Sequence, residues 1–154
     1  AAVEAAWDRV MQRVAEAEPE ADVRGATIQA MAPKGREVIM GAVRDPRFGP
    51  LIMFGLGGIY AEALRDVVFR LAPLRPLSAE RMLDGIRGKA ILGAFRGAAA
   101  VDRQALADNL QRLSQLMPEF PAIEELDMNP VMAYEDGLCV VDARVVLSDP
   151  QGPS

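Results

Sequence analysis

The feature that most constrains the fold is a hairpin signal near the end of the chain. Asp136-Gly137 lies between two apolar runs, and an Asp-Gly step in that setting is typical of a two-residue β-turn. Such a turn places Asn129 opposite Arg144 on two antiparallel strands. Since side chains alternate along a strand, Asp127 and Asn129 then share one face with Asp142 and Arg144. A slip of one residue would send one strand's polar side chains to the opposite face, so the prediction depends on the register.

That shared face would gather two carboxylates, a carboxamide and a guanidinium. Hard oxygen ligands of this kind suit Mg²⁺, which proteins usually hold with one or two carboxylates plus substrate phosphates. The pattern also has a simpler interpretation, because acidic residues that alternate with apolar ones are ordinary on a strand with one solvated face. The residues alone leave both interpretations open.

Length and composition indicate one folded domain. With 154 residues, of which 51% are hydrophobic and 25% charged, the chain is long enough to bury a core and unlike a disordered protein. A net charge of −5 with scattered arginines argues against nonspecific nucleic-acid binding. No apolar run reaches about 18 residues, and no secretion signal is visible. We therefore expect a cytoplasmic protein with neither nucleic-acid nor membrane partners.

The absence of histidine excludes several kinds of chemistry. This chain can carry no Ser-His-Asp triad, no imidazole zinc site and no phosphohistidine. The single cysteine, Cys139, lies in an apolar segment and is interpreted as a buried, inert thiol. Any chemistry must rely on carboxylates, arginines, backbone amides or a bound metal ion.

Hydrophobic periodicity predicts a mainly antiparallel sheet covered by helices, an α/β fold of the α+β type. Ser78 is the expected N-cap of a helix, and the tail 148–154 is expected to be frayed. The predicted elements are a helix at 3–17, strands at 26–32, 38–44 and 51–54, a short helix through Glu62, a strand at 67–71, a helix at 78–84, a helical turn within 86–100, a helix at 102–117 and the hairpin.

Two regions of the chain together resemble one protein family. Glu125-Leu126-Asp127-Met128-Asn129-Pro130, followed by Val141-Asp142-Ala143-Arg144, resembles the end of the ATP-grasp domain of NDP-forming acyl-CoA synthetases. These include ADP-forming acetyl-CoA synthetase and, more distantly, the succinyl-CoA synthetase β subunit. Asp45-Pro46, Phe48-Gly49-Pro50 and Phe54-Gly55-Leu56-Gly57-Gly58 are similar to the family's Asp-Pro, Phe-Gly-Pro and Phe-Gly-x-Gly-Gly pattern. The resemblance covers nearly the whole chain and implies an ATP-grasp lobe.

The resemblance implies a magnesium site and a phosphate loop. In the family, the Asn of the Asn-Pro pair and the Asp of the second strand bind the magnesium of the nucleotide, which implies Asn129 and Asp142 here. Asp127 occupies the accompanying acidic position. At Gly57 and Gly58, glycine permits close backbone approach to a ligand, and successive amides would hold phosphate oxygens. The alternative is a loop that merely turns from a strand into a helix.

The resemblance also implies an adenine and ribose site. The backbone of Met31 would face the adenine edge with Gln29 nearby, and Glu37 would accept hydrogen bonds from the ribose hydroxyls. On sequence alone, Gln29 and Glu37 are as readily explained as solvated strand ends. Beyond the glycine region, Asp66 and Arg70 are interpreted as a surface pair of little energetic weight.

The resemblance implies that residues 1–147 are the C-terminal part of an ATP-grasp domain, binding ATP or ADP with Mg²⁺. The parent protein would convert a carboxylic acid, CoA and ATP into acyl-CoA, ADP and phosphate. Its phosphate-gripping lysine would precede residue 1, and a CoA-binding portion would be a separate subunit or a fused domain. This chain alone is therefore expected to complete no reaction.

Two other functions are compatible with the sequence. One is a catalytically impaired, synthetase-like regulatory domain of a protein acetyltransferase. The other is an interaction domain that binds no nucleotide. A histidine and a lysine in the preceding lobe would favour the synthetase, and their loss beside a fused acetyltransferase would favour regulation.

Overall fold

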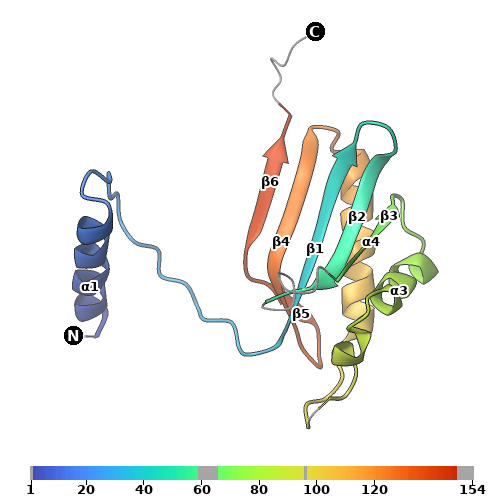
Figure 1. Ribbon diagram of the computed structural model, residues 1–154, viewed down its shortest axis with the longest axis horizontal. Helices are drawn as coiled ribbons and strands as arrows, with labels where there is room; N and C mark the ends of the chain where they lie inside the picture. The colour runs from blue at the N-terminus through green and yellow to red at the C-terminus, as the bar shows by residue number, and fades with distance from the viewer. Residues whose placement is uncertain (1, 59–65, 96, 149–154) are drawn as a thin grey trace. The chain divides into compact units, whose positions relative to one another are not determined.

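The computed structural model describes residues 2–58, 66–95 and 97–148. Residues 1–31 and 32–154 form two compact units, which are described separately (Figure 1). Among the described residues, no helix combines the length and the apolar composition that crossing a bilayer requires. The predicted helix through Glu62 and most of the predicted tail lie outside the described residues.

The N-terminal unit contains one helix and an extended segment. Helix α1 (Ala2–Ala17) confirms the predicted helix, and none of its residues is buried. The strand predicted at 26–32 is wrong, because this segment forms no regular structure and both Gln29 and Met31 are exposed. Its composition favours an extended backbone, but a strand also needs a neighbouring backbone to pair with. The only other element within this unit is a helix.

The second unit is built on an antiparallel sheet, as predicted. The sheet has the order β3-β2-β1-β4-β5. Strand β6 also pairs with β4, along a different part of β4 from β5. The five strand pairs among the described residues are all antiparallel. Figure 1 shows β4 and β1 at the centre of the sheet. The strands are β1 (Arg36–Asp45), β2 (Gly49–Leu56), β3 (Val67–Leu71), β4 (Ile123–Ala133), β5 (Leu138–Val140) and β6 (Ala143–Leu147).

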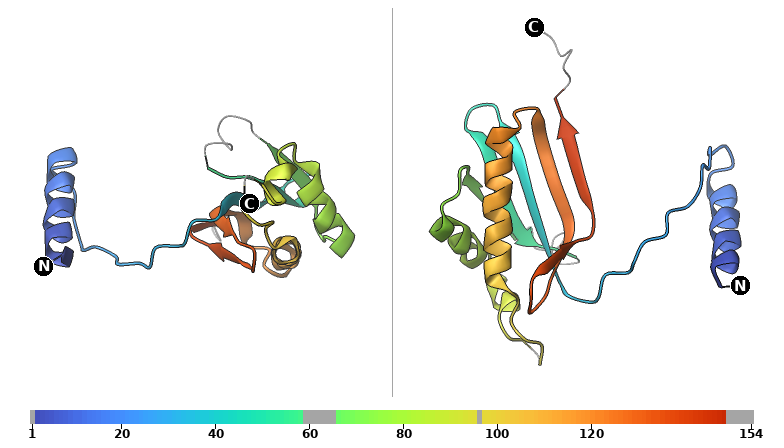
Figure 2. Two further views of the ribbon diagram at one scale, coloured as in Figure 1. Left: turned by 90° about the horizontal axis from the view of Figure 1, so that it is seen from below. Right: turned by 180° about the vertical axis from the view of Figure 1, so that it is seen from behind.

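Helices pack against one face of this sheet. They are α3 (Pro76–Gly85), the 3₁₀ turn η1 (Lys89–Leu92) and α4 (Arg103–Glu119), which packs on β1 and β2. Helix α4 lies behind the sheet in Figure 1 and in front of it in the rear view of Figure 2. The opposite face, here called the open face, carries no element of this unit among the described residues.

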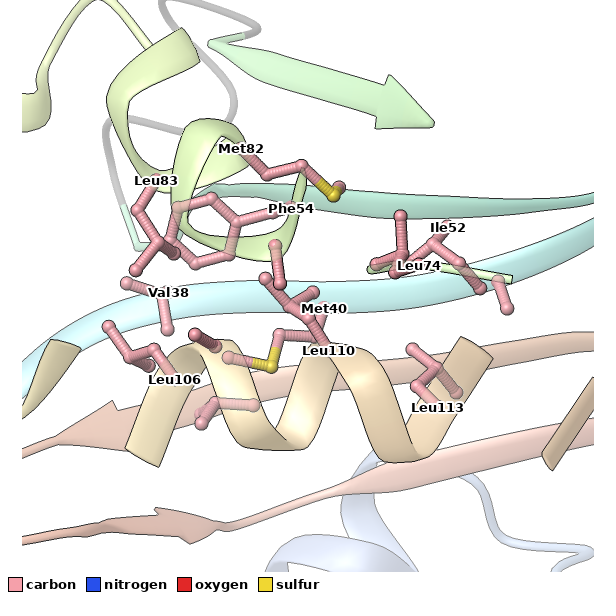
Figure 3. Close-up of a cluster of buried hydrophobic side chains, with 14 of the residues drawn as sticks. Val38, Met40, Ile52, Phe54, Leu74, Met82, Leu83, Leu106, Leu110 and Leu113 are labelled. Carbon is pink, nitrogen blue, oxygen red and sulfur yellow. The ribbon is translucent and has the colours of Figure 1, made fainter. Parts of the chain in front are cut away.

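The hydrophobic core lies between the sheet and these helices. Figure 3 shows Phe54 of β2 beside Leu83 of α3, with Met40 of β1 beside Leu110 of α4. The heptad-like spacing that predicted α4 also predicted its buried side. All four residues on that side are buried: Leu106, Leu110, Leu113 and Met117.

Two details of the elements differ from the sequence predictions. Helix α3 begins two residues before Ser78, with Pro76 in its first turn and no side-chain cap, so the predicted N-cap is wrong. Proline suits the first turn because its fixed φ is already helical and its missing N–H is not needed there. Cys139 is exposed on β5 and not buried, because this three-residue strand lies at the edge of the sheet.

Asp102 caps α4 and ties it to the hairpin between β4 and β5. Its carboxylate accepts hydrogen bonds from the backbone N–H of Ala105 at 2.9 Å and of Gly137 at 3.1 Å. These hydrogen bonds favour the ionised form, with the bond from Ala105 contributing most, and they lower the pKa of Asp102 below its usual value.

The lowered pKa of Asp102 predicts a loss of stability in acid. A depressed folded-state pKa contributes stability above the unfolded pKa, and that contribution disappears as the pH falls through the folded pKa. We expect the melting temperature to fall below about pH 4, and to fall less in Asp102→Asn, whose side chain caps without titrating. Thermal melts followed by circular dichroism at several pH values measure this. An equal fall in both proteins would contradict it.

Candidate functional site

Three of the predicted site residues meet in one hollow at the paired ends of β1 and β2. The hollow has a volume of about 380 Å³. It contains a carboxylate from Glu37, glycine backbone from the end of β2, and an apolar wall. The lining residues are Gly35, Arg36, Glu37, Leu56, Gly57, Gly58 and Ile91.

Glycine suits both positions that face Glu37, for different reasons. Gly58 has a φ of +60°, and a Cβ there would lie 2.5 Å from Glu37 Oε2. At Gly57, a Cβ would lie 3.0 Å from the carbonyl carbon of Glu37. The glycine pair thus lets the end of β2 pass close to the start of β1. The Glu37 carboxylate therefore lies next to Gly58.

The structure changes the role predicted for Gly57. Its backbone N–H donates to the carbonyl oxygen of Glu37 at 2.9 Å, which continues the pairing of β1 and β2. This amide is therefore not available to a phosphate oxygen, as the sequence interpretation required. Gly57 contributes close packing against Glu37, and any cradle of amides would have to come from other residues.

Asp66 is a site residue that sequence reasoning misplaced. It is buried, with 5% of its surface exposed, and its carboxylate accepts hydrogen bonds from the N–H groups of Arg87 and Gly88, both at 2.7 Å. The expected surface pair with Arg70 is wrong, and Arg70 donates to the Phe69 carbonyl instead. An acidic residue just before an apolar strand can bond to backbone amides, but the sequence does not say which ones.

The second group of predicted residues lies on the open face of β4 and its neighbours. Asp127 pairs with Arg144, and the N–H of Asn129 donates to the carbonyl oxygen of Asp142 at 3.1 Å. Directly opposite residues of an antiparallel pair share a face, so these four side chains lie on one side of the sheet. Asn129 and Asp142 are exposed, and Asp127 is half-buried.

The register of this hairpin differs from the predicted one. Ala133 pairs with Leu138, and the N–H of Tyr134 donates to the carbonyl oxygen of Gly137 at 3.1 Å, so Asp136-Gly137 is not the two-residue turn. Asn129 therefore lies opposite Asp142 and not Arg144. The partner of each β4 residue moves by two positions, and a shift of two keeps every side chain on its predicted face.

Electrostatic interactions at this face bear most on Asp127. Partial burial raises the pKa of its carboxyl, and the charges of Glu125 and Asp142 raise it further, while Arg144 opposes them. The ionised form of Asp127 is thus disfavoured, and a bound cation would relieve this. Gly41 of β1 lies opposite Asp127, and glycine is needed there because a Cβ would lie 2.9 Å from the carbonyl oxygen of Leu126.

The donor set of this face fits Mg²⁺ only in part. Within the described ranges, no three side chains of the His, Cys, Asp and Glu types gather closely enough to form a metal site. Asp127, Asn129 and Asp142 supply two carboxylates and one carboxamide, which are hard oxygen donors. Mg²⁺ commonly takes one or two carboxylates and completes its octahedron with phosphates and water.

Gln29 and Met31 belong to the N-terminal unit, so the structure does not combine them with the hollow. Their predicted contacts with adenine stay predictions. The structure does add Leu56 and Ile91, which form the apolar part of the hollow. No motif in the sequence marks these two residues as members of a site.

Comparison with known proteins identifies the family. The ATP-grasp domain family matches residues 1–147. The chain belongs to the ATP-grasp domain family. It is 46% identical over 142 residues to the β subunit of acetate–CoA ligase (ADP-forming) I of Pyrococcus furiosus, covering 92% of this chain and 61% of that subunit.

Solved structures show the same ATP-grasp fold. One structure of acetyl-coenzyme A synthetase 1 of Ca. Korarchaeum cryptofilum, with coenzyme A and Ca-AMPCP, has a TM-score of 0.87 at 43% identity. It covers 95% of this chain and 64% of that chain. A second, with coenzyme A and Mg-AMPPCP, has a TM-score of 0.74 at 48% identity and covers 76% of this chain and 55% of that chain. This ATP-grasp chain thus spans about three fifths of the length of the relatives named here.

Proposed function

We propose that this chain is the nucleotide-binding portion of an ADP-forming acyl-CoA synthetase, with acetyl-CoA as the product. It would bind Mg·ATP during phosphoryl transfer in acid–thiol ligation. The observation that carries the proposal is the convergence of Glu37, Gly57 and Gly58 on one hollow. The relatives named above are acetate–CoA ligases and acetyl-coenzyme A synthetases, which supports this choice of reaction.

In this proposal the hollow binds the nucleoside of ATP. The exposed carboxylate of Glu37 accepts hydrogen bonds from the two ribose hydroxyls. Gln29 and the backbone of Met31 are proposed to contact adenine, as the family resemblance implies. In the hollow, Gly57 with Gly58 allows the nucleotide to approach the backbone. Ile91, which is half-buried, supplies apolar surface for the base, and the buried Leu56 lies behind it at the hollow.

The open face of β4 supplies the metal ligands. Asn129 and Asp142 hold Mg²⁺, and Asp127 lies beside them as the accompanying carboxylate. Glu37, Asp127 and Asn129 all lie on the open face, since the buried residues Val38 and Met40 alternate with Glu37 on β1. When bound, Mg²⁺ neutralises charge on the transferring phosphates. A related structure contains Mg-AMPPCP, which supports the choice of Mg²⁺ as the metal.

The remaining partners are proposed from the relatives. CoA and the carboxylic acid would bind through the rest of the protein, as a CoA-binding subunit or a fused domain, since the related structures contain coenzyme A. Without those parts the chain is expected to be inactive. A cytoplasmic location stays a prediction.

Calorimetric titration of the intact protein with Mg·ATP tests the proposal. We expect saturable binding that depends on Mg²⁺, together with ADP formation that requires acetate and CoA. Mg·2′,3′-dideoxy-ATP lacks the hydroxyls assigned to Glu37 and should bind roughly 10- to 100-fold more weakly, the value of one or two hydrogen bonds to a charged group.

Two outcomes would contradict this function. Binding of Mg·ATP without any acetate- and CoA-dependent ADP formation would favour the regulatory domain. The absence of both heat and a thermal shift would leave an interaction domain that binds no nucleotide. Equal affinity for ATP and its dideoxy analogue would exclude the role assigned to Glu37.

A further inference from the structure

Asp66 is a buried carboxylate that the proposed chemistry does not use. It lies just before β3 and is 5% exposed, whereas Glu37 and Asp142 are exposed. Burying a carboxylate is costly unless hydrogen bonds satisfy it. Each Asp66 oxygen accepts one backbone N–H at 2.7 Å, from Arg87 and Gly88. Charge-assisted bonds of this length are among the stronger ones in proteins, so the carboxylate holds this backbone firmly.

The clamped backbone leads directly into the wall of the hollow. The carbonyl oxygen of Gly88 accepts a hydrogen bond from the N–H of Ile91 at 2.9 Å, which forms the turn η1. Ile91 then lines the hollow. The carboxylate of Asp66 therefore positions Ile91 through two successive hydrogen bonds, one from Gly88 to Asp66 and one from Ile91 to Gly88.

The same residue also positions the other apolar part of the wall. The carbonyl oxygen of Asp66 accepts a hydrogen bond from the N–H of Leu56 at 3.3 Å. Leu56 packs so closely on Gly88 that a Cβ on this glycine would collide with Leu56 Cδ1. Leu56 and Ile91 are thus joined through Asp66 and Gly88.

We infer that Asp66 is a positioning residue for nucleotide binding, which holds Ile91, backed by the buried Leu56, as a preformed apolar wall for the purine base. The inference rests on the proposed function, because the hollow must bind a nucleotide. A preformed wall avoids the ordering of side chains on binding, so its loss should weaken binding without altering groups that contact the phosphates. Asp66 acts through its neighbours and touches no reacting atom.

The test compares two buried polar residues that hold backbone amides. Asp66→Asn keeps the shape of the side chain but removes one of its two acceptors. The control is Ser114→Ala, because Ser114 is fully buried and its hydroxyl accepts from the N–H of Leu74 at 3.0 Å, on a helix that does not line the hollow. Each variant removes one acceptor of a backbone N–H. Only Asp66→Asn should weaken nucleotide binding.

Titration of the intact protein with Mg·ATP measures the effect. We expect Asp66→Asn to raise Kd and the KM for ATP about tenfold with little change in kcat, and Ser114→Ala to leave Kd unchanged. If Asp66 acts through Ile91, then Asp66→Asn and Ile91→Ala must have non-additive effects on Kd in a double-mutant cycle. The cycle of Ser114→Ala with Ile91→Ala should be additive.

Each outcome distinguishes this inference from the function on which it rests. A wild-type protein that binds no nucleotide overturns both. The inference alone is overturned if the wild-type protein binds Mg·ATP and Asp66→Asn binds it equally well. It is also overturned if the effects of Asp66→Asn and Ile91→Ala on Kd are additive. If Asp66→Asn does not fold, Ile91→Ala is measured by itself. An unchanged Kd for Mg·ATP in this variant would show that the apolar wall does not contribute to nucleotide binding, which overturns the inference.

Discussion

Replacing Asp142 with alanine is expected to reduce kcat/KM for ATP in the intact protein by roughly 10²–10³-fold, the effect of removing one preorganised group that stabilises charge. The carboxylate lies opposite Asn129 on the open face, where both residues are proposed to hold Mg²⁺. Without it, the cation loses a charged ligand and the transferring phosphates lose part of their neutralisation. Steady-state kinetics over a series of Mg²⁺ concentrations measures the effect, and excess Mg²⁺ should restore part of the activity.

Asp136→Ala is the matched control for this experiment. Asp136 is an exposed carboxylate in the same hairpin, six residues earlier, and it lies at the turn. Its loss changes the net charge by the same amount, so general electrostatic effects cancel in the comparison. Equal activities of the two variants, or a deficit in Asp142→Ala that is independent of Mg²⁺, would exclude Asp142 as a ligand.

Replacing Phe54 with alanine should lower the free energy of unfolding by about 3–5 kcal/mol, the usual cost of deleting a buried aromatic ring. Phe54 is completely buried between β2 and the helices α3 and α4 (Figure 3). Since a domain of this size is typically stable by about 5–15 kcal/mol, a large part of its stability would be lost. Urea denaturation measures the change as a lower midpoint at unchanged m-value.

Phe69→Ala makes the same chemical change on the open face. Phe69 lies on β3 with 45% of its surface exposed, so its loss should cost less than about 1 kcal/mol. The pair of variants thus reports which face of the sheet is covered by the helices. Similar losses of stability in both variants would show that the open face is also covered in solution.

Local sequence patterns predicted the structure correctly wherever the interactions that form an element lie within one segment of the chain. The helical spacing of Leu106, Leu110 and Leu113 predicted both α4 and its buried side, since a helix brings such residues onto one face. The strands β1, β2 and β3 followed from short apolar runs between turn residues. The shared face of Asp127 and Asn129 also followed, because it depends only on the alternation of side chains along a strand.

The errors arose where a second segment decides the outcome. The segment 26–32 has the composition of a strand but no partner within its unit, so it forms none. The predicted hairpin register was wrong by two positions, and the turn makes a contact that local pattern does not contain, because the carboxylate of the distant Asp102 accepts from the N–H of Gly137. Asp66 was misjudged for the same reason, since its partners Arg87 and Gly88 lie 21 and 22 residues away.

The amino-acid sequence was enough to establish the family, the sheet with its helical cover and the side of β4 that carries oxygen ligands. The family was indicated by the resemblance of two motif regions, whereas the sheet and its polar side follow from periodicity and composition, which act over a few neighbouring residues. Tertiary structure alone showed that Glu37 meets the glycine pair, that the Gly57 amide is already engaged, and that Asp66 joins Leu56 to Ile91. Such contacts depend on how separate segments pack together, and packing is a property of the whole fold.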